Sequence, residues 1–294
     1  MVLNGGNSMN ISNNWQDYEC LATGNKEKLE RWGNIILNRP DPTIVWAKSN
    51  NSIWKNWDGY YHRSNEGGGY WEFKKKLPEY WTVNYKHLTF KVSPTNFKHT
   101  GIFPEQATNW DYIMNKIKES NNEEFRVLNL FAYTGCATMA ASSAGAKEVV
   151  HVDAAKGMID WAKENVKLSH LEDNTIRFIC EDVIKFLDRE IRRGRTYHAI
   201  IMDPPSYGRG PNKEVWRFED NIQELLDKVK QLLDKDYSFL LISSYTTGLS
   251  ATSLSNILSL TFKDSHIETG ELGIPVKENN LTLPCGIYGK VSKH

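Results

Sequence analysis

The chain has 294 residues, of which 40% are hydrophobic and 24% charged, proportions typical of a globular protein. Its 36 lysine and arginine residues balance 36 aspartate and glutamate residues, so net charge provides no argument for a polyanionic partner. No uncharged apolar run is long enough to span a bilayer, and residues 1–15 lack the features of a secretory signal. We therefore expect a cytoplasmic protein without membrane contact.

The cysteines and histidines indicate no metal site. The four cysteines are scattered, with no Cys-x-x-Cys pair, and the eight histidines add no metal-ligand spacing. We expect neither a bound metal nor a disulfide scaffold. The length leaves room for one large α/β domain and a smaller one.

The first stretch of the chain is rich in aromatic residues and turns. Seven of the ten tryptophans fall before Ser93: Trp15, Trp32, Trp46, Trp54, Trp57, Trp71 and Trp81. Alternating segments at 43–46 and 85–92 predict short antiparallel strands. We predict a small β-rich domain over residues 1–93. Its aromatic side chains, with Arg63 and Lys74 to Lys76 nearby, suit either a small β core or substrate recognition by stacking on RNA.

The rest of the chain alternates strand and helix patterns. Candidate strands cover 126–131, 148–152, 175–180, 198–202 and 238–243, and candidate helices cover 109–119, 156–169 and the apolar positions from Ile222 to Leu233. Parallel neighbouring strands need crossover helices, so this alternation predicts an α/β domain with a parallel sheet and helices on both faces. We place this domain at residues 94–294.

A cofactor site is predicted where the strands end. The first strand turns into its helix over 131–138, where Gly135 allows close backbone approach. Asp153 ends the second strand, eighteen positions after Gly135, near the spacing at which a carboxylate meets a ribose diol. Glu181 and Asp182 end the third strand, where they suit an adenine amine, and Asp203 ends the fourth. Any one of these acids could instead be a helix cap.

The residues of the turn indicate which kind of nucleoside cofactor the site binds. A dinucleotide fold needs two more glycines for its pyrophosphate, but Ala132, Ala137 and Thr138 occupy the neighbourhood here. No Gly-Lys-Ser or Gly-Lys-Thr follows the strand, so a phosphate-binding loop is also disfavoured. S-adenosylmethionine has no phosphate and tolerates this turn.

A rigid loop follows the fourth strand at Asp203-Pro204-Pro205-Ser206-Tyr207. The prolines stop the strand ladder, and the loop carbonyls can face a substrate. Hydrogen bonds from an amine on a nucleobase to Asp203 and the Pro204 carbonyl would hold its nitrogen in line for methyl transfer. Tyr207 could stack on the base. The alternative is that the two prolines are only loop punctuation.

Several of these segments resemble class I methyltransferases that depend on S-adenosylmethionine and are related to bacterial large-subunit ribosomal RNA methyltransferases. The matching segments are 100–110, Val127 to Gly135, His151 to Ala154, Glu181 to Val183 and Asp203 to Pro211. The resemblance implies a Rossmann-like, doubly wound, mostly parallel sheet of seven strands. It implies catalytic roles for Asp203, Pro204, Pro205 and Tyr207. It implies cofactor contacts from Phe103, Gln106, Asn129, Phe131, Tyr133, Thr134, Gly135, Cys136, Ala137, Thr138, Asp153, Ala154, Asp182, Val183 and Asp203.

The absence of a cysteine nucleophile limits which atom can accept the methyl group. Family members that methylate carbon 5 of cytosine carry a cysteine after the fifth strand, where this chain has Ile242-Ser243-Ser244-Tyr245-Thr246-Thr247. We therefore expect methylation of a nucleobase heteroatom, with ribosomal RNA as substrate. The alternatives are a small-molecule or protein acceptor, or a non-catalytic RNA-binding relative. The oligomeric state is not indicated.

Overall fold

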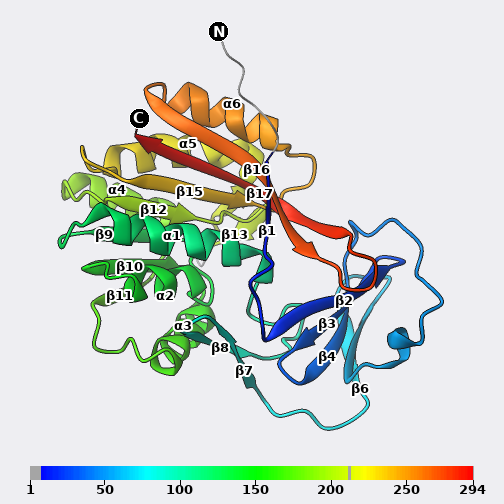
Figure 1. Cartoon of the computed structure of the whole chain (residues 1–294). Coiled ribbons are helices and arrows are strands. Elements are labelled where there is room, and N and C mark those ends of the chain that lie inside the picture. Colours follow the sequence, from blue (N-terminus) through cyan, green and yellow to red (C-terminus); the bar gives the residue numbers. More distant parts are fainter. Residues whose placement is uncertain (1–7, 211–212, 294) are drawn as a thin grey trace. The chain divides into compact units, whose positions relative to one another are not determined.

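The computed structural model describes residues 8–210 and 213–293, and these form two compact units (Figure 1). The described residues of the first unit fall in 8–10, 108–272 and 286–293. Those of the second unit fall in 11–107 and 273–285. The predicted boundary of an independent N-terminal domain at residue 93 stays a prediction.

The first unit is built on an eight-stranded sheet. In spatial order its strands are β1 (Ser8–Ile11), β16 (Ser265–Pro275), β17 (Thr282–Lys293), β15 (Phe239–Ser244), β12 (Ala199–Met202), β9 (Arg126–Leu130), β10 (Glu148–Asp153) and β11 (Ile176–Cys180). The strands from β15 to β11 are parallel, and β17 runs antiparallel to β15. The doubly wound, mostly parallel sheet is confirmed, with β1 as an eighth strand at the edge.

Helices cover both faces of this sheet (Figure 1). They are α1 (Ala107–Ser120), α2 (Cys136–Ser143), α3 (Lys156–Leu168), α4 (Val183–Arg192), α5 (Phe218–Leu232) and α6 (Ala251–Thr261). A short hairpin of β13 (Tyr207–Arg209) and β14 (Val215–Arg217) lies between β12 and α5 along the chain. None of the helices in the described part of the chain is long and apolar enough to cross a membrane.

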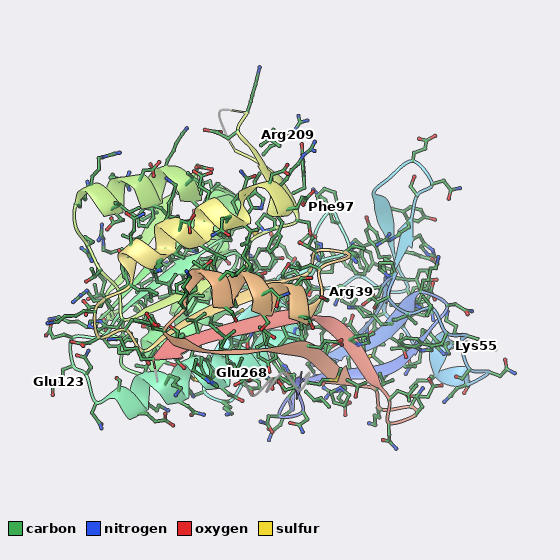
Figure 2. The ribbon with its side chains drawn as sticks, turned by 90° about the horizontal axis from the view of Figure 1, so that it is seen from above. Arg39, Lys55, Phe97, Glu123, Arg209 and Glu268 are labelled. Carbon is green, nitrogen blue, oxygen red and sulfur yellow. The ribbon has the colours of Figure 1, made fainter. Side chains whose placement is uncertain are left out.

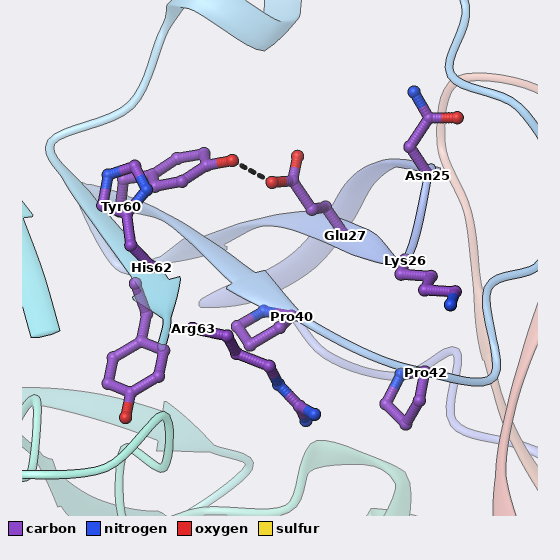
Figure 3. Close-up of a pocket in the computed structure, with 9 residues that line it drawn as sticks. Asn25, Lys26, Glu27, Pro40, Pro42, Tyr60, His62 and Arg63 are labelled. Atoms are coloured by element: carbon purple, nitrogen blue, oxygen red, sulfur yellow. Dashed lines mark hydrogen bonds between the residues drawn. The ribbon is translucent and has the colours of Figure 1, made fainter. Parts of the chain in front are cut away.

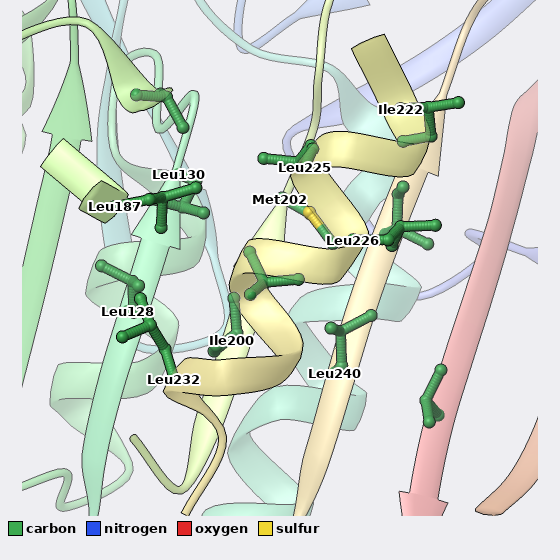
Figure 4. Close-up of a cluster of buried hydrophobic side chains, with 14 of the residues drawn as sticks. Leu128, Leu130, Leu187, Ile200, Met202, Ile222, Leu225, Leu226, Leu232 and Leu240 are labelled. Carbon is green, nitrogen blue, oxygen red and sulfur yellow. The ribbon is translucent and has the colours of Figure 1, made fainter. Parts of the chain in front are cut away.

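Alternate strand residues point to opposite faces, which places the main core. Leu128, Leu130, Ile200, Met202 and Leu240 pack on one side of the sheet against α4, α5 and α6 (Figure 4). Helix α5 contributes one apolar stripe to this core through Ile222, Leu225, Leu226, Val229 and Leu232. Each such side chain stabilises the fold by about 1.5–3 kcal/mol when fully buried. Residues between these strand positions, such as Asn129, face the other helix layer.

The second unit is β-rich. Its larger sheet has the order β2 (Tyr18–Gly24), β3 (Glu27–Trp32), β4 (Ile35–Pro40), β5 (Gly59–Arg63) and β6 (Gly69–Phe73). All neighbours are antiparallel except β4 and β5. Strands β7 (Trp81–Tyr85) and β8 (Leu88–Val92) form a separate hairpin, and two short 3₁₀ helices, η1 (Ser52–Lys55) and η2 (Pro104–Gln106), complete the unit.

One strand prediction in this unit is wrong, and another is confirmed except at its start. The segment 43–46 is a loop, because the Asp41 carboxylate accepts hydrogen bonds from the backbone N–H and hydroxyl of Thr43 and forms a turn there. In the segment 85–92, residues 88–92 form strand β8, which is antiparallel to β7, whereas Lys86 adopts a φ of 51° in the turn before it. Turn chemistry therefore overrode the alternating pattern at 43–46 and delayed the start of the strand at 85–92.

The aromatic residues of the second unit divide between two environments. Trp32 is fully buried, with its ring 4.6 Å from that of Tyr18. Tyr18 donates to Glu30, which also forms a buried ion pair with Arg39 at 2.6 Å. The other six tryptophans before Ser93 are half-buried. Two of these six, Trp54 and Trp57, pack against the core cluster of Leu21, Ala22 and Leu29.

Candidate active site

The predicted site residues of the first unit gather at one edge of its sheet. In the parallel register, Leu130 of β9 pairs with Val152 of β10 on one side and with Met202 of β12 on the other. Asp153 pairs with Cys180 at the end of β11. Because the strands end level, the segments that follow them leave from the same edge. This edge is where ligands bind in doubly wound sheets.

The turn after β9 has an unusual backbone. Phe131 and Tyr133 both have a φ of 53°, and Gly135 has a φ of 85°. Left-handed conformations cost non-glycine residues about 1–3 kcal/mol and persist only where the surroundings hold them. Here the Ala132 N–H donates to the Val152 carbonyl at 3.0 Å. The Tyr133 N–H donates to Asp153 Oδ2 at 2.9 Å. The turn is thus tied to the end of β10.

A buried asparagine supports the same turn from helix α3. Asn165 is fully buried, and its Nδ2 donates to the Thr134 carbonyl at 3.0 Å. An amide that spans from α3 to the turn limits movement of the backbone just before helix α2. The turn is therefore held from two elements, β10 and α3.

Gly135 is required by both conformation and space. It precedes helix α2 with a positive φ, and an added Cβ would lie 3.1 Å from the Ala162 Cβ and 3.2 Å from His151 Cε1. Most side chains would be strained here. The absence of a side chain therefore lets the turn lie against Ala162 of α3 and His151 of β10.

The carboxylate of Asp153 is the hydrogen-bond acceptor expected for the hydroxyl groups of a ribose. Its two carboxylate oxygens each accept one backbone N–H, Oδ2 from Tyr133 and Oδ1 from Ala155 at 2.9 Å. A carboxylate has about four acceptor positions, so capacity remains for a diol. Burial raises the pKa of Asp153 above its ordinary value, and the two backbone hydrogen bonds oppose that shift.

The acids after β11 have separate partners. Glu181 forms an ion pair with Arg189 at 2.7 Å. Asp182 caps helix α4, with its Oδ1 accepting from the Lys185 N–H at 3.1 Å. Cys180 is exposed beside them. Because Asp182 uses one of its acceptor positions for the cap, it can still receive a ligand N–H.

Three polar residues form a buried network beneath the turn. Asn129 Nδ2 donates to Thr138 Oγ1 at 3.0 Å, and this hydroxyl also lies 2.8 Å from His151 Nδ1. Burial lowers the pKa of His151 to about 3, against the opposing effect of the Tyr133 backbone, so the ring is neutral. The network joins β9, α2 and β10 under Gly135.

The loop after β12 is joined to the hairpin that follows it. Trp216 Nε1 donates to the Pro205 carbonyl at 2.6 Å, and the Phe218 N–H donates to the Ser206 carbonyl at 3.0 Å. The Trp216 ring lies 5.3 Å from the ring of Phe131. Trp216 therefore contacts both the turn after β9 and the proline loop.

The exposed part of the loop carries the ring predicted to stack. Tyr207 is 51% exposed, and its hydroxyl accepts from Arg209 Nε at 2.8 Å. Arg209 lies on the hairpin (Figure 2). Ser206 Oγ lies 3.0 Å from Thr246 Oγ1, in the segment after β15. Pro211, part of the motif in the sequence, lies outside the described residues.

The remaining predicted residues lie in varied places. Cys136 and Ala137 are half-buried in the first turn of α2, and Ala154 is exposed after β10. Val183, the first residue of α4, has its side chain buried in the core, so only its backbone can meet a ligand. Phe103 directly precedes η2 in the second unit and Gln106 is the last residue of that helix, where the Gln106 N–H donates to the Phe103 carbonyl at 3.0 Å.

Sequence reasoning missed Trp216 and Asn165. Trp216 lies 11 positions after Pro205, and Asn165 lies 31 positions after Thr134. Neither residue belongs to a motif. In the helical pattern of α3, nothing distinguishes Asn165 from the other polar positions. Only the proximity of α3 to the turn gives Asn165 its role.

Comparison with known proteins assigns the family. The sequence model of the S-adenosylmethionine-dependent methyltransferases matches residues 46–241, two thirds of the chain. The chain belongs to this family. A crystal structure of the SAM-dependent methyltransferase from Agrobacterium tumefaciens is 33% identical, with a TM-score of 0.93 over 100% of this chain and 98% of that one. A methyltransferase structure from Streptococcus mutans shares the fold, with a TM-score of 0.74 at 17% identity over 95% of this chain and 76% of that one.

Curated relatives of this methyltransferase are longer proteins. The ribosomal RNA large subunit methyltransferase K/L of Syntrophotalea carbinolica is 31% identical over 152 residues, which cover 52% of this chain and 20% of that protein. The ribosomal RNA large subunit methyltransferase I of Cronobacter sakazakii is 39% identical over 85 residues, covering 29% of this chain and 22% of that protein. The matched part thus spans about a fifth of these relatives.

The residues at the sheet edge fit S-adenosylmethionine, the cofactor of the methyltransferase. Asp153 offers a carboxylate for the ribose, and Gly135 is followed directly by helix α2 rather than by a glycine-rich phosphate loop. Within residues 8–210 and 213–293, no group of three or more histidine, cysteine or acidic residues could hold a metal ion.

Proposed function

We propose that this methyltransferase transfers a methyl group to a heteroatom of a nucleobase in RNA, with ribosomal RNA as the substrate class. The observation that carries the proposal is the pairing of Met202 with Leu130, which brings Asp203 and Pro204 to the same edge as the turn after β9. The names of the curated relatives support RNA as the acceptor.

In this proposal the protein contacts the nucleoside of the cofactor at both its ribose and its adenine. Asp153 would accept the ribose hydroxyls and Asp182 an adenine amine, while the backbone from Tyr133 to Thr138 would line the rest. Phe103 and Gln106 stay predictions from the resemblance. When bound, S-adenosylmethionine supplies an electrophilic methyl group on its sulfonium.

The chain's own contribution is to bind and orient the acceptor. An amine attached to a nucleobase is a poor nucleophile, because its lone pair is delocalised into the ring. The Asp203 carboxylate and the Pro204 carbonyl would accept its N–H groups and hold the nitrogen in line with the methyl group. The Pro205 and Ser206 carbonyls are already used by Trp216 and Phe218, which limits movement of this loop.

The residues favour a heteroatom over carbon. Carbon 5 of cytosine needs a cysteine nucleophile, and neither 203–210 nor 242–247 contains a cysteine. Methylation of nitrogen needs no covalent intermediate with the protein. Tyr207, exposed on β13, is available to stack on the base that carries the acceptor.

The test uses methyl transfer to defined acceptors. Ribosomal RNA from a strain that lacks the gene is incubated with enzyme and isotopically labelled S-adenosylmethionine, and the nucleosides are mapped by mass spectrometry. We expect one nucleoside in the RNA to be methylated on a nitrogen or oxygen of its base, and methylation of a ribose oxygen would contradict the proposal. The variant Asp203→Ala should lose at least a hundredfold in kcat/KM. The control Asp173→Ala removes an exposed acid elsewhere in the unit and should be as active as the wild type.

The outcomes distinguish the alternatives. Label in protein or small molecules but not in RNA would assign a different acceptor and overturn the proposal. Label on carbon 5 of a pyrimidine would overturn the heteroatom assignment. Full activity of Asp203→Ala would exclude the proposed role of the proline loop.

A further inference from the structure

A row of four aromatic rings crosses one face of the second unit. The ring centroids of Trp57 and Tyr60 lie 5.5 Å apart, those of Tyr60 and His62 lie 4.0 Å apart, and those of His62 and Tyr70 lie 5.2 Å apart. Tyr60 and His62 alternate along β5, and His62 pairs with Tyr70 across the ladder to β6. Tyr60, His62 and Tyr70 therefore share one face of the sheet, and Trp57, in the loop before β5, lies next to Tyr60. These four residues are called the ring row.

The ring row is partly open to solvent. Tyr70 is 64% exposed, and Tyr60 and His62 are half-buried. Trp57 is half-buried and also packs against the core cluster of Leu21, Ala22 and Leu29. Accessible rings provide faces on which unpaired bases can stack, each worth about 1–3 kcal/mol by alanine substitution.

The charge around the ring row favours a polyanion. Residues 48–76 hold six lysine and arginine residues and three acidic residues, a net charge of +3 in a chain whose net charge is zero. Lys74 Nζ lies 4.1 Å over the Trp57 ring. Among these charges, Lys48 is paired with Glu27 and Lys75 with Asp58, and Glu72 lies 2.7 Å from His62 Nε2.

A pocket of about 240 Å³ lies beside the ring row where β4 and β5 separate. Figure 3 shows Lys26 and Arg63 as its cationic side chains, with Arg63 running past Pro40. Lys98 is close by, because its Nζ donates to the Pro40 carbonyl at 3.4 Å. Burial, followed by the charges of neighbouring basic residues including Arg63, lowers the pKa of Lys98 to about 8. Crowded cations of this kind are stabilised by a bound anion.

We propose that the ring row and this pocket bind single-stranded RNA, with bases stacked on the rings and phosphates held by Lys26, Arg63 and Lys74. A duplex hides its base faces, so the rings select unpaired nucleotides. An acidic peptide would meet the cations but not use the rings. The proposal rests on the proposed function, because it gives that activity a place to hold its RNA outside the catalytic edge.

The experiment measures binding without methyl transfer. The full chain is titrated into a fluorescein-labelled, unstructured RNA strand of about 12 nucleotides, and fluorescence anisotropy gives Kd at several salt concentrations. We expect Tyr70→Ala to raise Kd by about tenfold, and Tyr70→Phe to restore it, since a phenyl ring still stacks. Arg63→Gln should lower the slope of log Kd against log salt by about 0.7.

The matched control is Tyr80→Ala. Tyr80 is 46% exposed in the same unit but outside the ring row, so its loss should leave Kd within about twofold of the wild-type value. Thermal unfolding of each variant shows whether it is folded. A duplex of the same sequence should bind more weakly than the single strand.

The results distinguish failure of this proposal from failure of the proposed function. If RNA is methylated but Tyr70→Ala binds as tightly as Tyr80→Ala, the surface is excluded and the activity stands; a protein partner at this face would give that result. If RNA binds through the ring row but is not methylated, the proposed function fails and the surface stands. If the wild type neither binds nor methylates RNA, both fail.

Discussion

The indole Nε1 of Trp216 donates to the carbonyl oxygen of Pro205 at 2.6 Å, while the indole ring lies 5.3 Å from that of Phe131. One side chain thus joins the loop proposed to hold the acceptor to the turn proposed to hold the cofactor. Its position in β14, opposite Gly208 of β13, is set by the hairpin register.

Trp216→Phe should lower the methyl-transfer rate without loosening the cofactor. The phenyl ring still packs on Phe131, but the Pro205 carbonyl loses its donor, at a cost of about 1 kcal/mol. We expect kcat to fall about fivefold to tenfold and Kd for S-adenosylhomocysteine to stay within twofold. Tyr237→Phe, which removes the contact of a hydroxyl with Ser265 at 2.8 Å in the same unit, is the control and should leave kcat unchanged. An unaltered rate in Trp216→Phe would remove Trp216 from the mechanism.

Gly135→Ala and Gly145→Ala separate backbone strain from crowding at the cofactor turn. Both glycines have positive φ, 85° and 100°, so each alanine should cost about 1–2 kcal/mol of unfolding free energy. A Cβ at Gly145 meets nothing within 4 Å, whereas one at Gly135 crowds Ala162 and His151. By calorimetry, only Gly135→Ala should weaken S-adenosylhomocysteine binding, by about tenfold or more. Equal affinities in the two variants would contradict a cofactor site at this turn.

Cofactor affinity should depend on the protonation of Asp153. Burial raises the pKa of this carboxyl, and its protonated form accepts fewer hydrogen bonds from a diol. We expect Kd for S-adenosylhomocysteine to rise as pH falls through this raised pKa. Asp153→Asn should bind about tenfold more weakly at neutral pH and show a flatter pH profile. If the wild-type Kd stays constant as pH falls through the pKa of Asp153, the carboxylate does not contact the ligand.

Protonation of His151 should destabilise the first unit in acid. Burial lowers the pKa of His151 to about 3, so the unfolded chain binds the proton more readily than the folded chain. The free energy of unfolding therefore decreases as pH falls from about 6.5 towards 3, by up to about 1.4 kcal/mol per pH unit for this group. Urea titrations between pH 6.5 and 4.5 give the free energy of unfolding at each pH. The slope of this free energy against pH should be smaller for His151→Gln than for the wild type. An identical slope would mean that His151 is charged in the folded protein.

Local patterns in the sequence determined the α/β alternation of the first unit. Strands β9, β10, β11, β12 and β15 and helices α1 and α3 lie within about two residues of the segments predicted for them, whereas α5 begins four residues before Ile222. Buried parallel strands are short apolar runs, and amphipathic helices repeat every 3.6 residues, so both signals are local. The acids after the strands were predictable for the same reason, because each follows an apolar run.

Only the tertiary structure decided how these residues are supported and what the second unit presents. Asn165 under the turn, Trp216 against Pro205, and the ring row across β5 and β6 all depend on contacts between elements that are separate in sequence. The strand predicted at 43–46 is a loop because of the turn at Asp41, and the strand predicted at 85–92 begins only at Leu88 because of the turn at Lys86. A periodic pattern reports which face of one element is buried, whereas pairing and register decide which side chains meet.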